Sequence, residues 1–112
     1  MKATVHFADD RVHAAYRKLA ASRRSEDRER IAMLDRAFDV IGQNAFAGTQ
    51  IPKRLIPHEY HQRYGPIEAL WKFDMAGGWR LVYMVAGDVD GTVQVGVIEW
   101  FDHGEYERRF KY

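Results

Sequence analysis

Apolar and aromatic side chains are densest in residues 70–85, where two such runs flank Gly77 and Gly78. Both runs are rich in aromatic and β-branched residues, and glycine supplies the positive φ that a tight hairpin turn needs. The pattern therefore predicts a β-hairpin. Because bulky apolar side chains occupy odd and even positions alike, we expect central strands that are covered on both faces. Two cations, Lys72 and Arg80, interrupt the runs, and we expect them to face a polar surface or groove where a functional site would lie.

The N-terminal part of the chain changes from a period of two to a helical period. Residues 2–7 alternate between apolar and polar side chains, which predicts a short strand. Two apolar stripes at helical spacing follow, and they predict two helices joined as an antiparallel pair. The stripes are Val12, Ala15, Tyr16, Leu19 and Ala20, and then Ile31, Leu34, Ala37, Phe38 and Ile41. Asp9 and Asp10 are suited to cap the first helix, Ser25 to cap the second, and Gly42 to end it.

The C-terminal part reads mainly as strands. Residues 51–57, bounded by Pro52 and Pro57, predict at most an edge strand, and residues 58–65 predict a polar and aromatic loop. Residues 92–100 predict a further strand. Helices separated from strands along the chain are typical of an α+β domain. We expect one domain over residues 1–112, with the N-terminal strand and the helical hairpin packed on an antiparallel sheet of about four strands. The other face of that sheet would form a groove.

Composition narrows the classes of protein to which the chain can belong. Its 112 residues, 46% of them hydrophobic, suffice for one buried core, and the absence of cysteine excludes disulfides and cysteine-bound zinc. Residues 1–10 hold no apolar run long enough for a signal peptide, and no segment reaches the roughly 18 apolar residues of a membrane span. We therefore expect a cytoplasmic protein without membrane contacts. The formal net charge of +1 does not by itself mark a nucleic-acid-binding protein.

Three short motifs follow one another in an order that resembles a known family. Residues 44–48 read Asn-Ala-Phe-Ala-Gly after the second predicted helix, residues 78–83 read Gly-Trp-Arg-Leu-Val-Tyr, and His103 and Tyr106 lie near the C-terminus. Together with the order of strand, helical hairpin and meander, they resemble the RelE/ParE superfamily of bacterial toxins from type II toxin–antitoxin modules. The resemblance extends over nearly the whole chain, and it implies a RelE-like fold.

The resemblance implies metal-independent cleavage of mRNA, commonly on the ribosome, by a toxin that a cognate antitoxin protein restrains. It assigns the family's central-strand arginine to Arg80 and a lysine on the preceding strand to Lys72. The family's C-terminal histidine and tyrosine correspond to His103 and Tyr106. No cofactor and no metal are implied. Relatives of the ParE branch share the fold but act on DNA gyrase and lack the nuclease residues, so a non-catalytic member that binds a protein partner stays open.

Cleavage of RNA without metal uses the 2′-hydroxyl as nucleophile on the neighbouring phosphate. The reaction needs a base, an acid, and cations that stabilise the charge developing on the phosphate. His103 is a candidate acid or base because imidazole titrates near neutral pH; alternatively, it is an exposed tail residue. Arg80 is a candidate phosphate clamp because its donors form a two-pronged fork; alternatively, it forms a salt bridge with Asp74 or Glu99 within the sheet.

Lys72 and Tyr106 complete the candidate catalytic set. Lys72 would neutralise the phosphate or assist proton transfer; alternatively, it extends its aliphatic stem along a strand edge. Tyr106 would stack on a base or orient a proton; alternatively, it caps the core together with Phe110.

Cations interleaved with aromatic residues in residues 53–64 indicate binding of unpaired RNA, because bases stack on aromatic rings while cations follow the phosphates. The candidate RNA-binding residues are Lys53, Arg54, His61, Arg63 and, in the tail, Arg108, where Arg109 and Lys111 add positive charge. The alternative is a solvated loop. A third interpretation of the whole chain is a regulatory module that binds nucleic acid without cleaving it, with strongly salt-dependent affinity.

The histidines were also considered as metal ligands. His58 and His61 are spaced to chelate a metal if they lie on a helix. The flanking Pro57 and Gly65 disfavour a helix, so we expect no metal site.

Overall fold

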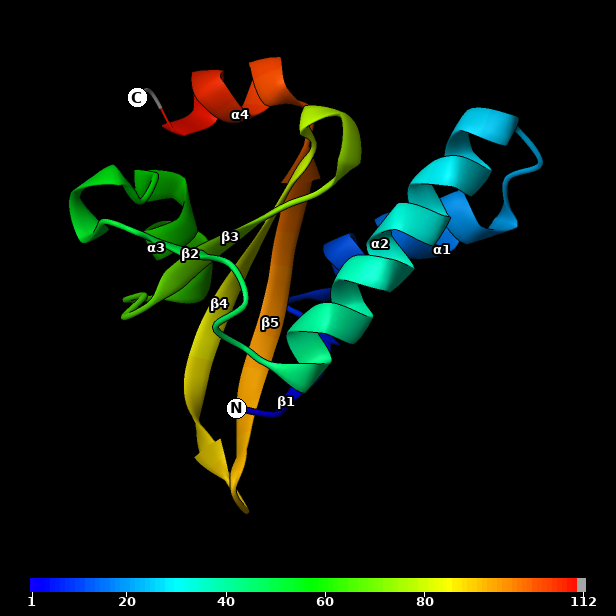
Figure 1. The fold of residues 1–112 in the computed structure, drawn as a ribbon. Helices are drawn as coiled ribbons and strands as arrows, with labels where there is room; N and C mark the ends of the chain where they lie inside the picture. The colour runs from blue at the N-terminus through cyan, green and yellow to red at the C-terminus, as the bar shows by residue number, and fades with distance from the viewer. Residues whose placement is uncertain (111–112) are drawn as a thin grey trace.

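The computed structural model of the chain describes residues 1–110 (Figure 1). Along the chain, two helices follow the first strand before the next strand begins. The elements in chain order are β1 (Ala3–Phe7), α1 (Asp10–Ala21), α2 (Ser25–Gln43), β2 (Thr49–Ile51), α3 (His58–Tyr64), β3 (Leu70–Asp74), β4 (Arg80–Val89), β5 (Thr92–Phe101) and α4 (His103–Phe110). Short 3₁₀ turns, η1 (Lys53–Leu55) and η2 (Ala76–Gly78), precede α3 and β4. The predicted α+β class is confirmed, with four α-helices and five strands among residues 1–110.

The sheet is mixed, which differs from the expected antiparallel sheet of about four strands. Its strand order is β1-β5-β4-β3-β2, and β1 runs parallel to β5 while the other neighbours are antiparallel. The difference arises because a long connection carries the chain from β1 through both helices before the meander begins, and such a connection permits parallel pairing. An edge strand, β2, does lie at the end of the sheet, but it covers Thr49–Ile51. Of the predicted residues 51–57 only Ile51 belongs to it, and Lys53–Leu55 form η1.

Helices cover both faces of the sheet, so the expectation of helices on one face and a groove on the other is wrong. On the first face α1 and α2 bury a core with the central strands, whose members are Val12, Leu34, Ala37, Ile41, Ala45, Leu81, Tyr83, Val93, Val95 and Val97. On the second face α3 and α4 contribute Tyr60, Tyr106 and Phe110 to another core. Two-sided burial agrees with the apolar runs of β3 and β4, which predicted central strands covered on both faces.

The predicted hairpin is present as β3 and β4. The strands pair antiparallel, from Leu70 opposite Met84 to Asp74 opposite Arg80. Residues 75–79 connect them, and Gly77 and Gly78 adopt positive φ values of 68° and 80°, as the sequence predicted. The amide of Met75 donates to the carbonyl of Trp79 at 2.7 Å and closes the connection.

Of the three helix ends that the sequence predicted, the structure confirms the start of α1 and differs at the start and the end of α2. Asp9 caps α1, since its carboxylate accepts a hydrogen bond from the amide of Val12 at 3.0 Å. Ser25 is the first residue of α2 and not its cap, because Arg24 occupies the cap position and makes no side-chain hydrogen bond there. Helix α2 also continues past Gly42 to Gln43.

Residues 58–64 form the helix α3, so their prediction as a loop is wrong. Tyr60 is fully buried in this helix, and its hydroxyl donates to a Glu99 carboxylate oxygen at 2.6 Å. Pro57 precedes the first turn, where its missing amide hydrogen costs nothing, and Gly65 with φ 76° ends the helix. The helix therefore depends on burial of one tyrosine against the sheet.

The loop of residues 44–48 is held by Tyr83 of β4. The buried hydroxyl donates to the carbonyl of Ala45 at 2.9 Å and accepts from the amide of Gly48 at 3.3 Å. Burial raises the pKa of Tyr83 to about 12. Asn44 accepts from the N-terminal amine at 2.9 Å, which ties the loop to the start of β1. In this chain the motif of residues 44–48 therefore fixes the path between α2 and β2.

Among residues 1–110 there is no helix that is both long enough and apolar enough to span a membrane.

Candidate functional site

Three of the four predicted catalytic residues lie together at the hairpin end of the sheet. Lys72 of β3 and Arg80 of β4 both approach the ring of Tyr106 in α4, with Lys72 Nζ 5.8 Å and Arg80 Cζ 5.7 Å from the ring centroid. Because Asp74 is paired with Arg80 and lies two residues after Lys72, these three side chains share one face of the sheet. Lys72, Asp74, Arg80 and Tyr106 are called the cationic cluster below.

Asp74 holds the two cations of the cationic cluster with one oxygen atom. Its Oδ1 lies 3.1 Å from Lys72 Nζ and 2.9 Å from Arg80 Nε. Arg80 Nε nevertheless makes no hydrogen bond within residues 1–110, so its contact with Asp74 is an ion pair without directed donation. Arg80 does donate from a terminal nitrogen to the carbonyl of Gly78 at 2.7 Å. The salt bridge to Asp74 that the sequence offered as an alternative is thus present, and one net positive charge remains.

The side chains of the cationic cluster differ in their access to solvent. Lys72 and Arg80 are 19% and 18% exposed, whereas Asp74 is 58% exposed. The cations are therefore partly desolvated, and the carboxylate that pairs with them is the more solvent-exposed partner.

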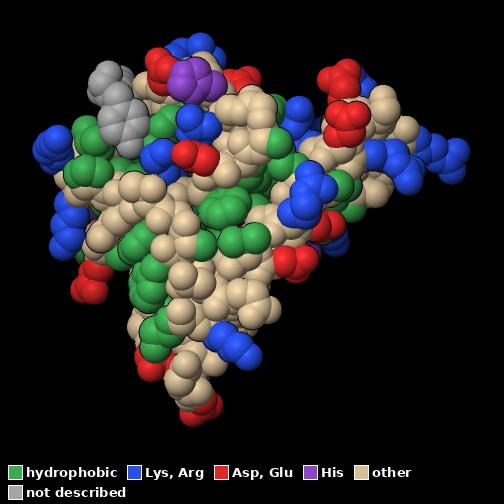
Figure 2. Space-filling view, viewed as in Figure 1, with side chains coloured by type: hydrophobic (Ala, Val, Ile, Leu, Met, Phe, Trp, Pro, Cys, Tyr) green, Lys and Arg blue, Asp and Glu red, His purple; other side chains and the backbone are tan. Residues whose placement is uncertain are grey.

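His103 begins α4 beside the turn of the hairpin. A Cβ atom added to Gly78 would lie 3.3 Å from His103 Cβ, so the turn passes close to this residue. The His103 side chain is 59% exposed, and its Nε2 pairs with Glu107 one helical turn later when the imidazole is protonated. The described ion pair of His103 is therefore with Glu107, although its backbone adjoins the turn that carries Arg80. Figure 2 shows basic, acidic and histidine side chains gathered over α4 and this turn.

Tyr106 has the core role that the sequence offered as an alternative, and its ring also adjoins the two cations. It is 3% exposed and packs on Phe110 with ring centroids 4.7 Å apart, so it belongs to the core. The same ring lies within reach of the two cations. Its core packing fixes the surface on which the cations rest.

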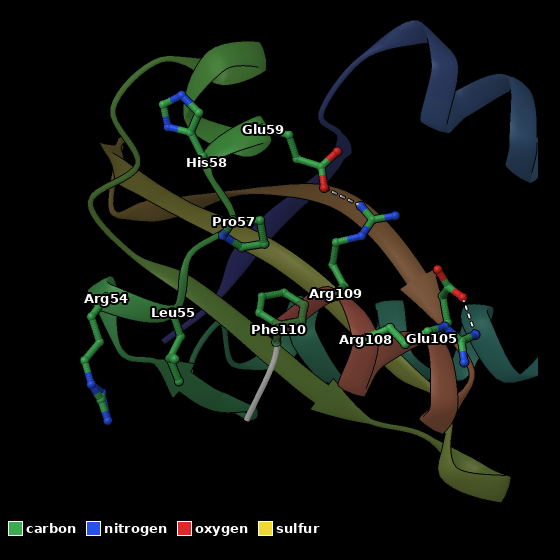
Figure 3. Close-up of a pocket in the computed structure, with 9 residues that line it drawn as sticks. All are labelled: Arg54, Leu55, Pro57, His58, Glu59, Glu105, Arg108, Arg109 and Phe110. Atoms are coloured by element: carbon green, nitrogen blue, oxygen red, sulfur yellow. Dashed lines mark hydrogen bonds and ion pairs between the residues drawn. The ribbon is translucent and has the colours of Figure 1, made fainter.

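The predicted RNA-binding residues do not form one group. Arg54 and Arg108 line a pocket of about 600 Å³ between residues 54–59 and residues 105–110 (Figure 3). Arg108 pairs with Glu105 at 2.5 Å, and Arg109 pairs with Glu59 at 3.0 Å on the same pocket wall. Acidic partners therefore offset much of the positive charge that faces this pocket, and the catalytic candidates Lys72, Arg80 and His103 do not line it.

The remaining RNA-binding candidates lie outside the pocket. Lys53 is exposed on η1, and Arg63 is exposed on α3, 6.0 Å from the ring of Tyr64. His61 is partly buried, and its Nδ1 accepts from the amide of Ile67 at 3.4 Å, which gives it a role in the backbone path after α3. Lys111 lies outside the described residues.

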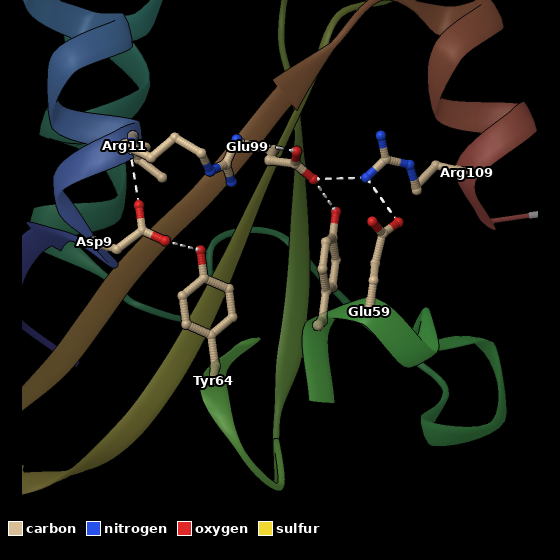
Figure 4. Close-up of polar contacts among 8 residues, drawn as sticks. Asp9, Arg11, Glu59, Tyr64, Glu99 and Arg109 are labelled. Carbon is tan, nitrogen blue, oxygen red and sulfur yellow. Dashed lines mark hydrogen bonds and ion pairs between the residues drawn. The ribbon is translucent and has the colours of Figure 1, made fainter. Parts of the chain in front are cut away.

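The second face of the sheet carries a polar network that the sequence did not predict (Figure 4). Glu99 of β5 is 14% exposed; it accepts from Tyr60 at 2.6 Å and from Arg109 at 3.1 Å, and Arg11 lies 3.8 Å from it. Burial and the hydrogen bond to Glu99 raise the pKa of Tyr60. The network joins α1, α3 and α4 to β5 and so holds α4 against the sheet. Its one local signal is a lone carboxylate inside the apolar run of residues 92–101.

A second part of this network joins α1 to α3. Tyr64 donates its hydroxyl to Asp9 at 2.8 Å. Partial burial raises the pKa of Asp9, but the hydrogen bonds from the Val12 amide and Tyr64 outweigh it and hold this pKa below its ordinary value. Asp9 therefore stays ionised in its double role as helix cap and partner of α3.

No group of three or more histidine, aspartate or glutamate side chains in residues 1–110 is placed to hold a metal ion. His58 and His61 do lie on a helix, contrary to the prediction for that segment.

Comparisons with known proteins add nothing to this geometry. No family model, no curated protein and no solved structure matches the chain. What the site can do follows from its own residues.

Proposed function

We propose that the chain is the toxin of a type II toxin–antitoxin module, a RelE-like mRNA endoribonuclease that needs no metal. The observation that carries the proposal is the convergence of Lys72, Arg80 and Tyr106 from three elements, with His103 at the adjoining turn. These are residue types that metal-free cleavage of RNA requires, and they lie within one small region. The order of β1, α1, α2 and a meander followed by a C-terminal helix supports a RelE-like fold.

The proposed reaction is an attack of the RNA on itself. The 2′-oxygen forms a bond to the adjacent phosphorus while the bond from phosphorus to the 5′-oxygen breaks, which leaves a 2′,3′-cyclic phosphate and a 5′-hydroxyl. One proton leaves the 2′-hydroxyl for a base, and one reaches the departing 5′-oxygen from an acid; His103 takes one of these two roles. Arg80 and Lys72 replace Asp74 with the phosphate and stabilise its developing charge.

Expression in a bacterial host tests the proposal. Inducing the chain is expected to arrest growth and to create new 5′ ends inside mRNA, whereas the Arg80→Ala/His103→Ala variant should do neither. A matched control is Arg28→Ala/His13→Ala, in which an exposed arginine and an exposed histidine outside the site are lost; it should act as the parent does. Co-expression of an antitoxin is expected to restore growth. Purified chain, supplied with free RNA or with translating ribosomes, shows whether cleavage needs the ribosome.

A second candidate is a non-catalytic protein of the RelE/ParE type that binds a protein partner such as an antitoxin or gyrase. Two observations favour it, namely that Asp74 already neutralises one charge of the cationic cluster and that His103 is exposed and paired with Glu107. Growth arrest without new mRNA ends would support this candidate. No arrest at equal expression would contradict the toxin proposal, and salt-dependent RNA binding without products would favour a regulatory module.

Replacing Asp74 by asparagine is expected to strengthen binding of single-stranded RNA at low salt. The carboxylate competes with phosphate for Lys72 and Arg80, and one unit charge at contact distance in water is worth about 1 kcal/mol, or about a fivefold change in affinity. The effect should shrink as salt rises. Fluorescence anisotropy with a labelled RNA measures it.

Asp88→Asn is the control for this prediction, because Asp88 is exposed near the other end of β4. It changes the net charge equally but should alter affinity much less. Equal affinities of Asp74→Asn and Asp88→Asn would show that RNA does not reach the cationic cluster.

A further inference from the structure

A cation–π stack joins α2 to the residue that precedes Arg80. The guanidinium carbon of Arg30 lies 3.7 Å from the ring centroid of Trp79, which is close contact for such a pair. Arg30 Nε is buried and makes no hydrogen bond within residues 1–110. For that nitrogen, contact with the indole face takes the place of a polar partner. Arg30 is one of several cations on α2 that the sequence presents as an ordinary charged face.

Trp79 belongs to the turn that places Arg80. Its carbonyl accepts from the amide of Met75 at 2.7 Å and from Arg80 at 3.4 Å, while the carbonyl of Gly78 accepts from Arg80 at 2.7 Å. The same turn passes His103 at Gly78, where a positive φ of 80° disfavours residues with a side chain and an added Cβ would lie 3.3 Å from His103 Cβ. A shift of Trp79 would therefore move both the carbonyl groups that orient Arg80 and the surface against His103.

The turn has open space on its α2 side. A groove of about 470 Å³ separates it from α2 and is lined by residues of both, including Met33, Ala76 and Gly77 as well as Arg30 and Trp79. Ala76 and Gly77 are exposed, so the turn gains little from burial there. The Arg30–Trp79 stack bridges this groove. Met75 packs one end of the turn against the first core, and the Arg30–Trp79 stack adds a contact that sets the distance between the other end and α2.

We propose that Arg30 is a positioning residue for RNA cleavage, which acts through Trp79 on Arg80 and His103; this inference rests on the proposed nuclease function. Arg30 lies on the α1–α2 face of the molecule and does not belong to the cationic cluster. Its effect is on the placement of reacting groups and not on the binding of RNA. Misplacement of catalytic groups by about 1 Å can cost about a hundredfold in rate.

The test compares three variants of the full chain. Arg30→Met keeps the aliphatic stem but removes the guanidinium, Arg30→Lys keeps the charge but not the planar stack, and Arg28→Met removes an exposed arginine of the same helix. We expect Arg30→Met to lower kcat by about ten- to a hundredfold with an unchanged KM for RNA. Arg30→Lys should recover part of the rate, and Arg28→Met should match the parent. Because a smaller fraction of folded protein also lowers the apparent kcat at an unchanged KM, the rate of each variant is normalised to its folded fraction.

NMR spectra of the same variants give a readout that does not need cleavage. In Arg30→Met we expect the amide signals of Gly78 and Arg80 and the ring signals of His103 to shift, whereas they should stay in place in Arg28→Met. Unmoved signals would overturn the proposal, and so would shifted signals with an unchanged kcat. If the parent chain cleaves no RNA under any condition, the nuclease function fails; shifted signals would then establish the coupling alone and overturn its role in catalysis.

Discussion

Replacing Arg80 by lysine is expected to lower the rate of RNA cleavage by about 10²- to 10³-fold, the effect of removing one donor that stabilises transition-state charge. Lysine keeps the positive charge, but it lacks the planar fork that binds two phosphate oxygens at once. It also loses the hydrogen bond by which Arg80 is held on the carbonyl of Gly78 at 2.7 Å. Affinity for RNA should change much less, because the net charge is the same.

Single-turnover kinetics on a labelled RNA measure this rate, and fluorescence anisotropy measures the affinity. Arg28→Lys is the matched control, since Arg28 is exposed on α2 and its replacement should leave the rate unchanged. If Arg80→Lys cleaves as fast as the parent, Arg80 serves only as a charge that pairs with Asp74, and it leaves the catalytic set.

Replacing Gly48 by alanine is expected to destabilise the fold by about 3 kcal/mol, through overpacking and a lost hydrogen bond. The new Cβ would lie 2.1 Å from the carbonyl oxygen of Lys72 and 2.9 Å from the hydroxyl of Tyr83. Neither atom can retreat easily, because one belongs to the backbone of β3 and the other to a fully buried side chain. The amide of Gly48 would also move from the Tyr83 hydroxyl that it now reaches at 3.3 Å. Urea denaturation measures the free energy of unfolding.

Gly87→Ala is the control for Gly48→Ala. A Cβ at Gly87 meets no atom within 4 Å, so its free energy of unfolding should stay within about 0.5 kcal/mol of the parent. Equal urea midpoints for the two alanine variants would show that the loop of residues 44–48 accommodates the added methyl group without loss of stability. Its close contact with β3 would then not be needed for the fold.

Local signals explain what could be predicted from the sequence. The hairpin is marked by Gly77 and Gly78, whose positive φ values are a property of the turn itself. The helical pair is marked by apolar stripes, of which Leu34, Ala37 and Ile41 are buried as a set. The cations of the candidate site stood out for the same reason, because a charged residue within an apolar run needs a particular partner or a polar surface.

Partners that are distant along the chain explain what could not be predicted. Helix α3 has seven residues and little stability of its own; it is held by Tyr60, whose partner Glu99 is 39 residues away. A salt bridge between Arg80 and Asp74 was one of two alternatives for that residue. That Lys72 shares the same carboxylate oxygen depends on side-chain placement across β3 and β4, which no pattern in the sequence specifies.

The parallel pairing of β1 with β5 has a consequence for how the chain folds during its synthesis. Residues 3–7 pair with residues 93–97, which are synthesised much later, and contacts of such long range delay folding. The helical pair emerges from the ribosome before the strands that it covers, so its apolar stripes stay exposed until those strands are made. Arg80, His103 and Tyr106 can meet only after β5 and α4 have left the ribosome, because Tyr106 belongs to α4. On the proposed function, a nascent copy therefore cannot cleave RNA until α4 has been made and has packed on the sheet.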